Sequence, residues 1–132
     1  MPRLQWPLAN GRPVVHVVLT LAVGGGKLTR TLLADTGAGS MPAPFELLLE
    51  ETDCLLCNGT FVQTVTLGGA YTSSYPVYLL RVEIPTLHFN HDLRAVGVPT
   101  VPNGLDGIAG FRFLNRFTYS NFGNRLEFGL ET

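Results

Sequence analysis

The sequence is poor in charged residues and has none of the charge clusters that mark several classes of protein. Asp, Glu, Lys and Arg make up only 14% of the 132 residues, the formal net charge is −1, and no group of Lys and Arg stands together. Nucleic acids and anionic membranes bind concentrated basic surfaces, so we expect neither as a partner. Hydrophobic residues make up 45% of the chain, a composition typical of chains that fold around a core.

Targeting and membrane-spanning segments are also lacking. The first seven residues contain no apolar segment of the kind found in a secretory signal peptide. The longest apolar run, residues 14–23, is interrupted by His16 and Thr20 and is too short to span a bilayer. We therefore expect a soluble, cytoplasmic protein, although a domain released from a larger precursor would show the same features.

Cysteine is scarce, and Cys54 and Cys57 are too few for a disulfide scaffold in a chain of this length. Their CxxC spacing also occurs in redox sites and in half of a zinc site, but no second Cys or His pair lies nearby in the sequence. Two incidental thiols are the favoured interpretation, with a zinc site shared across a dimer as the alternative. His88 and His91 lie on no clear helix, and we expect no metal and no cofactor.

Glycine and proline are plentiful by contrast, with 15 and 9 residues spread along the chain. The elements between them must be short, which favours strands over long helices. Residues 14–23 and 28–34 predict two strands joined at Gly24-Gly25-Gly26. Because no Lys-Ser/Thr pair and no helix follows these glycines, we do not expect a phosphate-binding loop.

The rest of the chain follows the same pattern of short elements. Strands or hairpins are predicted over residues 61–67, 74–84, 95–99 and 118–130, a compact apolar turn over 105–110, a loop over 54–59, a two-turn helix over 45–51 and one helical turn over 113–117. No linker or low-complexity stretch divides them. Residues 1–132 therefore predict one mostly β domain, with its core over about residues 13–130.

The strand over residues 28–34 runs directly into Asp35-Thr36-Gly37-Ala38, which places one carboxylate at the tip of a turn. Asp and Gly suit ordinary turns, so this tripeptide alone is a weak signal. The context strengthens it, because apolar or small residues precede Asp35 and an apolar Ile108-Ala109-Gly110 lies far downstream.

Over residues 13–130 the sequence resembles the retropepsin-like aspartic proteases, the single-domain dimeric relatives of pepsin. The most specific segments are residues 33–38 (LADTGA) and 106–114 (DGIAGFRFL). The resemblance implies an all-β acid-protease closed barrel with one or two short helices and one lobe per chain. It also implies that the first segment is the catalytic loop and that Ile108, Ala109 and Gly110 cross behind it in a ψ-shaped motif.

The resemblance further implies roles for the loop residues. Asp35 is the catalytic residue, the Thr36 hydroxyl donates across the dimer axis, and Gly37 lets the backbone approach closely and presents N–H groups to the carboxylates. Ala38 stands where pepsin-like enzymes often carry Ser or Thr. Without that hydroxyl beside the carboxylate, we expect an activity optimum in the mildly acidic to neutral range.

The chain contains a single Asp-Thr-Gly, since Asp106-Gly107 is not followed by the Thr/Ser-Gly pair of a second copy. Peptide hydrolysis of this type needs two carboxylates that share a proton. A homodimer with Asp35 at its two-fold axis would supply both. The prediction is therefore a homodimeric aspartic endopeptidase that hydrolyses a peptide or protein substrate by an Asp-activated water.

The tip of the second hairpin, Gly68, Gly69, Ala70 and Tyr71, has two interpretations. Glycines at this position suit an ordinary hairpin end, and they also suit a mobile flap that closes over a bound peptide. Position within the family favours the flap and a substrate-binding role for these four residues.

Two departures from the family concern the dimer. Viral enzymes carry an acidic residue where this chain has Gly39, and Arg where it has Phe111. The charged network of those dimers is therefore not expected here. Two other functions stay open: a catalytically inactive dimerisation or peptide-binding module of the same fold, and a small β-barrel that carries an apolar ligand.

Overall fold

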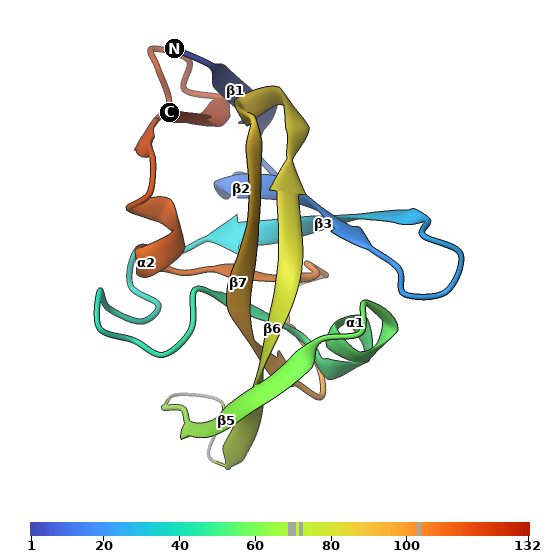
Figure 1. Cartoon of the computed structure of the whole chain (residues 1–132). Coiled ribbons are helices and arrows are strands. Elements are labelled where there is room, and N and C mark those ends of the chain that lie inside the picture. The colour runs from blue at the N-terminus through green and yellow to red at the C-terminus, as the bar shows by residue number, and fades with distance from the viewer. Residues whose placement is uncertain (69–70, 72, 103) are drawn as a thin grey trace.

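Strands make up most of the regular structure in the computed structural model, which describes residues 1–68, 71, 73–102 and 104–132 (Figure 1). The strands are β1 (Arg3–Pro7), β2 (Val14–Thr20), β3 (Lys27–Ala34), β4 (Leu47–Glu50), β5 (Thr60–Thr66), β6 (Ser74–Ile84), β7 (Phe89–Val98), β8 (Gly107–Ala109), β9 (Thr118–Ser120) and β10 (Glu127–Glu131). The helical elements are α1 (Glu51–Leu56), α2 (Phe111–Leu114) and the 3₁₀ turn η1 (Pro85–Leu87).

Six strands close into a barrel in the order β2-β3-β8-β4-β7-β6, because β6 also pairs with β2. The long β6 makes this possible: its first half pairs with β5, and Val82 and Glu83 near its end pair with β2. A separate three-stranded sheet, β1-β10-β9, joins the two ends of the chain (Figure 1). The expectation of a mostly β chain with a closed barrel and short helices is confirmed.

The interior of the barrel is filled by alternate side chains of its strands. Along β2, Val15, Val17 and Leu19 are fully buried, as the period of two in a strand requires when one face meets the core. Trp6 of β1 and Leu130 of β10 belong to the same cluster. The three-stranded sheet is thus attached to the barrel through shared apolar packing.

The helix predicted over residues 45–51 is wrong. Residues 47–50 form β4, which runs parallel to β7 and antiparallel to β8. With a strand on each side and core on both faces, its three leucines are all buried, and a continuous apolar run of this length fits a buried strand and a helix equally well. The helix α1 begins only at Glu51 and occupies part of the predicted 54–59 loop.

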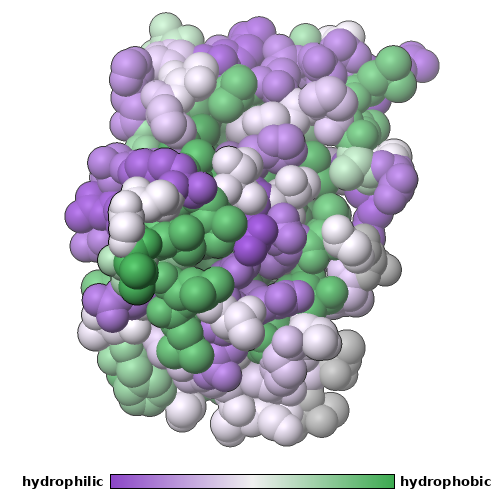
Figure 2. Space-filling view, turned by 90° about the vertical axis from the view of Figure 1, so that its right-hand side faces the viewer, coloured by the Kyte–Doolittle hydropathy of each residue, from purple (hydrophilic) through white to green (hydrophobic). Residues whose placement is uncertain are grey.

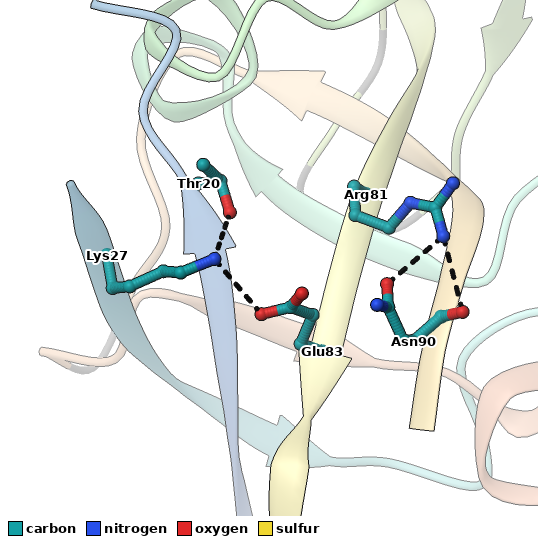
Figure 3. Close-up of polar contacts among 5 residues, drawn as sticks. All are labelled: Thr20, Lys27, Arg81, Glu83 and Asn90. Carbon is teal, nitrogen blue, oxygen red and sulfur yellow. Dashed lines mark hydrogen bonds and ion pairs between the residues drawn. The ribbon is translucent and has the colours of Figure 1, made fainter. Parts of the chain in front are cut away.

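The predicted hairpins are confirmed as β2–β3, β5–β6 and β9–β10. The strand predicted over residues 95–99 is longer, because β7 begins at Phe89. Its first half was missed because it is largely polar, and it lies along β6 with polar cross-strand contacts (Figure 3). Arg81 Nη1 donates to Asn90 Oδ1 at 3.1 Å, and Lys27 Nζ of β3 extends across β2 and donates to Glu83 Oε2 of β6 at 3.3 Å.

One face outside the barrel carries exposed hydrophobic side chains. This face includes the tip of the β2–β3 hairpin and α1, and Figure 2 shows a hydrophobic group there among polar residues. Val23, Leu55 and Leu56 are the exposed large hydrophobic residues of these two segments, and the Ala22 N–H donates to the Leu56 carbonyl. None of the predicted site residues belongs to this group. Within the described ranges, no helix has the length and apolar character needed to cross a membrane.

Candidate active site

Asp35 stands at the point where β3 leaves the sheet. The preceding residue, Ala34, pairs with Ala109 of β8 in parallel, and the Asp35 N–H donates to the Ala109 carbonyl at 3.0 Å. On its other side β8 pairs with β4, so Asp35 emerges from three hydrogen-bonded strands. The backbone that carries the carboxylate is therefore held by the barrel itself rather than by a free loop.

Backbone N–H groups of the loop itself also fix the position of Asp35. The Gly37 N–H donates to Asp35 Oδ1 at 2.9 Å, and the Ala38 N–H donates to the Asp35 carbonyl at 3.1 Å. The Asp35 residue is partly exposed, and the neighbouring Thr36 is exposed. A half-buried carboxylate with one backbone donor keeps acceptor positions free for water or a substrate.

The downstream segment lies directly behind this loop. The Phe111 N–H donates to the Ala38 carbonyl at 2.8 Å, and the Gly110 N–H donates to the Glu46 carbonyl at 2.9 Å. A Cβ at Gly110 would lie 2.8 Å from the Ala38 oxygen, so only glycine fits between the two segments. The structure thus brings together the residues predicted as the catalytic loop and those predicted as its crossing segment.

A cavity of about 290 Å³ opens beside the loop. Its wall takes residues from the loop, the crossing segment, the start of β4 and the end of the β5–β6 hairpin: Gly37, Ala38, Gly39, Phe45, Glu46, Leu48, Leu67, Gly68, Tyr71, Ile108 and Gly110. Most of these are apolar or glycine. The wall includes Gly37 and Ala38, whereas the Asp35 and Thr36 side chains are not part of it among the described residues.

The predicted flap residues are only partly described. Gly68 and Tyr71 line the cavity, while Gly69 and Ala70 lie outside the described residues. Tyr71 Oη donates to the Thr100 carbonyl at 3.1 Å, and its ring packs edge-on against Tyr75. Burial raises the pKa of the Tyr71 hydroxyl from a value that already lies well above neutral pH.

Two charged residues near the loop, Glu46 and Arg112, were not identified as functional candidates from the sequence. Glu46 is only 4% exposed, and its carboxylate accepts two hydrogen bonds from Arg116, at 2.6 and 2.7 Å. Arg112 donates to the Ala43 carbonyl, in the segment between the loop and β4. The one available signal was an acidic residue inside the apolar run of residues 45–49, since a buried carboxylate requires a partner.

Asp106 has a different environment from Asp35. Its Oδ2 accepts from the Thr31 N–H at 2.9 Å, and its own N–H donates to the Thr31 carbonyl at 2.9 Å. This reciprocal pair joins the start of β8 to β3. Asp106 is therefore a structural residue that aligns the two strands leading to the site.

The thiols and histidines show no metal site. Cys54 is fully buried, and burial raises its pKa to about 12, while the pKa of Cys57 is also raised, chiefly by burial. A buried Cys54 does not reach a metal shared with another chain unless α1 moves. His88 is the residue after η1, and His91 packs on Phe89. In the part of the chain described, no three His, Cys, Asp or Glu side chains are arranged to hold a metal ion.

The arrangement as a whole places one carboxylate, held by the Gly37 N–H and emerging from hydrogen-bonded strands, in a loop whose next residues line an apolar cavity able to take a side chain. A single carboxylate of this kind can hold and polarise a water molecule, but proton transfer in both directions needs a second acid or base. A scan against protein-family models, a search of curated proteins and a search of solved structures each found no match to this chain.

Proposed function

We propose that this chain is a retropepsin-like aspartic endopeptidase that acts as a homodimer. The observation that carries the proposal is the position of Asp35: its N–H is bonded to β8, its Oδ1 accepts from Gly37 at 2.9 Å, and the next residues of its loop line an apolar cavity. One chain supplies one such carboxylate. A symmetric dimer that places the two Asp35 loops together supplies the pair that the chemistry needs.

In this mechanism the two Asp35 carboxyl groups share one proton and hold a water molecule between them. The ionised carboxylate removes a proton from the water, and the water oxygen attacks the carbonyl carbon of the peptide bond. At the same time the protonated carboxyl group donates its proton to the carbonyl oxygen. The resulting tetrahedral diol collapses when the carboxyl group that took the water proton gives it to the leaving nitrogen, the other carboxylate takes a proton from one hydroxyl, and the C–N bond breaks, which restores the shared proton. No covalent bond to the enzyme forms at any step.

The cavity supports a substrate with an apolar side chain next to the cleaved bond. Phe45, Leu48 and Ile108 contribute apolar surface to its wall, and the end of the β5–β6 hairpin covers it from another side. An extended peptide is the natural partner of such a hairpin, since its backbone can add to exposed strand groups. In this proposal the hairpin is the flap of the enzyme.

The proposal is tested by incubating the protein with a mixed peptide library at several pH values from acidic to neutral and identifying cut products by mass spectrometry. Wild type, Asp35→Asn and the control Asp92→Asn are compared at concentrations where sedimentation shows a dimer. Asp92 lies in an exposed ion pair with Arg81 and is far from the loop in the sheet order, so the same chemical change there should leave cleavage intact.

Cleavage by wild type and Asp92→Asn but not by Asp35→Asn is the expected result, with a loss of at least about 10³-fold for a group that carries the proton transfers. Equal cleavage by all three proteins would show that Asp35 is not catalytic. A confirmed dimer that binds peptides and cuts none would favour the inactive peptide-binding module instead.

A further inference from the structure

Glu46 occupies an unusual position for an acidic residue. It precedes β4 and has 4% of its surface exposed, and both of its carboxylate oxygens are bonded to the guanidinium of Arg116. Arg116 follows α2, and its guanidinium lies 5.8 Å from the centre of the Phe89 ring. The fork of an arginine fixes a carboxylate in both distance and angle, so the Glu46 side chain has one defined orientation.

The Glu46 backbone connects this ion pair to the Asp35 loop. Its carbonyl accepts from the Gly110 N–H at 2.9 Å, and the next N–H, that of Phe111, donates to the Ala38 carbonyl at 2.8 Å. Ala38 in turn donates to the Asp35 carbonyl at 3.1 Å. Three hydrogen bonds in series therefore lead from Glu46 to the residue that carries the carboxylate.

Stability alone does not account for an ion pair at this position, in which Glu46 is buried and the Arg116 side chain is 37% exposed. Removing the Glu46 carboxylate from water costs free energy that offsets much of its attraction to Arg116, so replacement of such a pair by neutral residues of similar size is often tolerated. A bidentate pair does, however, restrict the local backbone to one arrangement. Its location at the junction of β4, β8 and the Asp35 loop is where such a restriction affects the geometry of the carboxylate.

We infer that Glu46 and Arg116 are positioning residues that hold the Gly110–Phe111 backbone, and through it the Asp35 loop, in the geometry that catalysis requires. The inference rests on the proposed protease function for its kinetic consequence. Its structural consequence, an ordered hydrogen-bond series behind the loop, does not depend on that function.

The chain contains a matched control. Arg30 and Asp53 form a second bidentate pair at 2.8 and 2.9 Å, and Asp53 is also 4% exposed. This pair joins β3 to α1. The side-chain hydrogen bonds of Arg30 and Asp53 within the described residues are to each other and not to the Asp35 loop.

The test compares the double variant Glu46→Gln/Arg116→Gln with the double variant Arg30→Gln/Asp53→Asn. Double replacement avoids leaving one unpaired buried charge, which by itself would strongly destabilise the protein. We expect kcat to fall about tenfold or more in the first variant while KM changes less than about twofold, because a small displacement of a catalytic group lowers the rate of the chemical step. The second variant should keep its kcat at a comparable melting temperature.

A second measurement does not need activity. Amide hydrogen exchange of Gly37, Gly110 and Phe111 should accelerate at least about tenfold in the Glu46/Arg116 variant and stay at wild-type rates in the control, because these amides lose their fixed acceptors. Equal effects of the two variants on kcat and on exchange, or no effect of either, would overturn the positioning role. If wild type cuts no peptide, the exchange data decide the inference separately from the proposed function.

Discussion

Cys54 and Cys57 differ in environment although they are only three positions apart in the sequence. Cys54 has no exposed surface, whereas Cys57 is partly exposed, and the pKa of Cys54 is raised to about 12. Only a thiolate attacks an alkylating reagent. At pH 8 iodoacetamide should therefore modify Cys57 slowly and leave Cys54 unmodified in the folded protein, as followed by peptide mass spectrometry. Both should react at similar rates in denaturant, and rapid native labelling of Cys54 would contradict its burial.

His16 makes stability depend on pH. Burial lowers its pKa from the ordinary value of 6.5, and the nearby Asp106 only partly opposes this effect. The unfolded chain then binds more protons than the folded one just below pH 6.5, so the free energy of unfolding should fall as the pH drops from 6.5 into the mildly acidic range. Urea unfolding of wild type and His16→Gln at several pH values checks this. The dependence in this range should be weaker in the variant, and an identical dependence would exclude His16 as its source.

At the scale of elements, β4 shows how a leucine run is used. Leu49 of β4 is fully buried, whereas Leu55 of α1 is 58% exposed. Leu49→Ala should lower the free energy of unfolding by about 2–5 kcal/mol because it leaves a cavity in the core. Leu55→Ala, the same change on the surface, should change the free energy of unfolding by no more than about 0.5 kcal/mol. Chemical denaturation measures both, and equal losses would contradict the assignment of β4 to the core.

The contact between β8 and β4 leaves no room for a side chain at Gly107. A Cβ there would overlap the Leu48 carbonyl oxygen and lie 2.9 Å from side-chain atoms of Leu32 and Leu49. Gly107→Ala should therefore destabilise the fold by about 1–3 kcal/mol or more, and it should also reduce peptide cleavage because β8 supports Asp35. Gly26→Ala is the matched control, since its Cβ would meet only Leu21 at 3.6 Å. Thermal unfolding should show no comparable loss of stability in the Gly26→Ala variant.

At the scale of the whole molecule, the proposed activity belongs to two chains. If each active site needs one Asp35 from each chain, a heterodimer of wild type and Asp35→Asn is inactive. Excess Asp35→Asn chains, added after dissociation and reassociation, should therefore suppress nearly all wild-type cleavage. The same excess of Asp92→Asn should leave it intact. Sedimentation checks that mixed dimers form. If they form and the rate of peptide cleavage is unchanged by excess Asp35→Asn, then one chain is sufficient for activity.

Much of the fold follows from local patterns. The glycine turn and β-branched residues predicted β2 and β3, and the alternation over residues 61–67 predicted β5, because strand preference and a tight turn depend mainly on neighbours in the sequence. The Asp35 loop and its crossing segment at Ile108-Ala109-Gly110 were singled out from their motifs, and the structure brings them together.

The tertiary structure decided what depends on distant partners. Leu47 to Leu49 become a strand because β7 and β8 pair with both edges, and the polar start of β7 is ordered because β6 lies beside it. Glu46 finds Arg116 70 residues further along the chain. The sequence by itself determined the turns, the amphipathic strands and the carboxylate loop, since these depend on adjacent residues. Which strand edges pair and which charged side chains meet depended on the tertiary structure, because the packing of the entire core determines them.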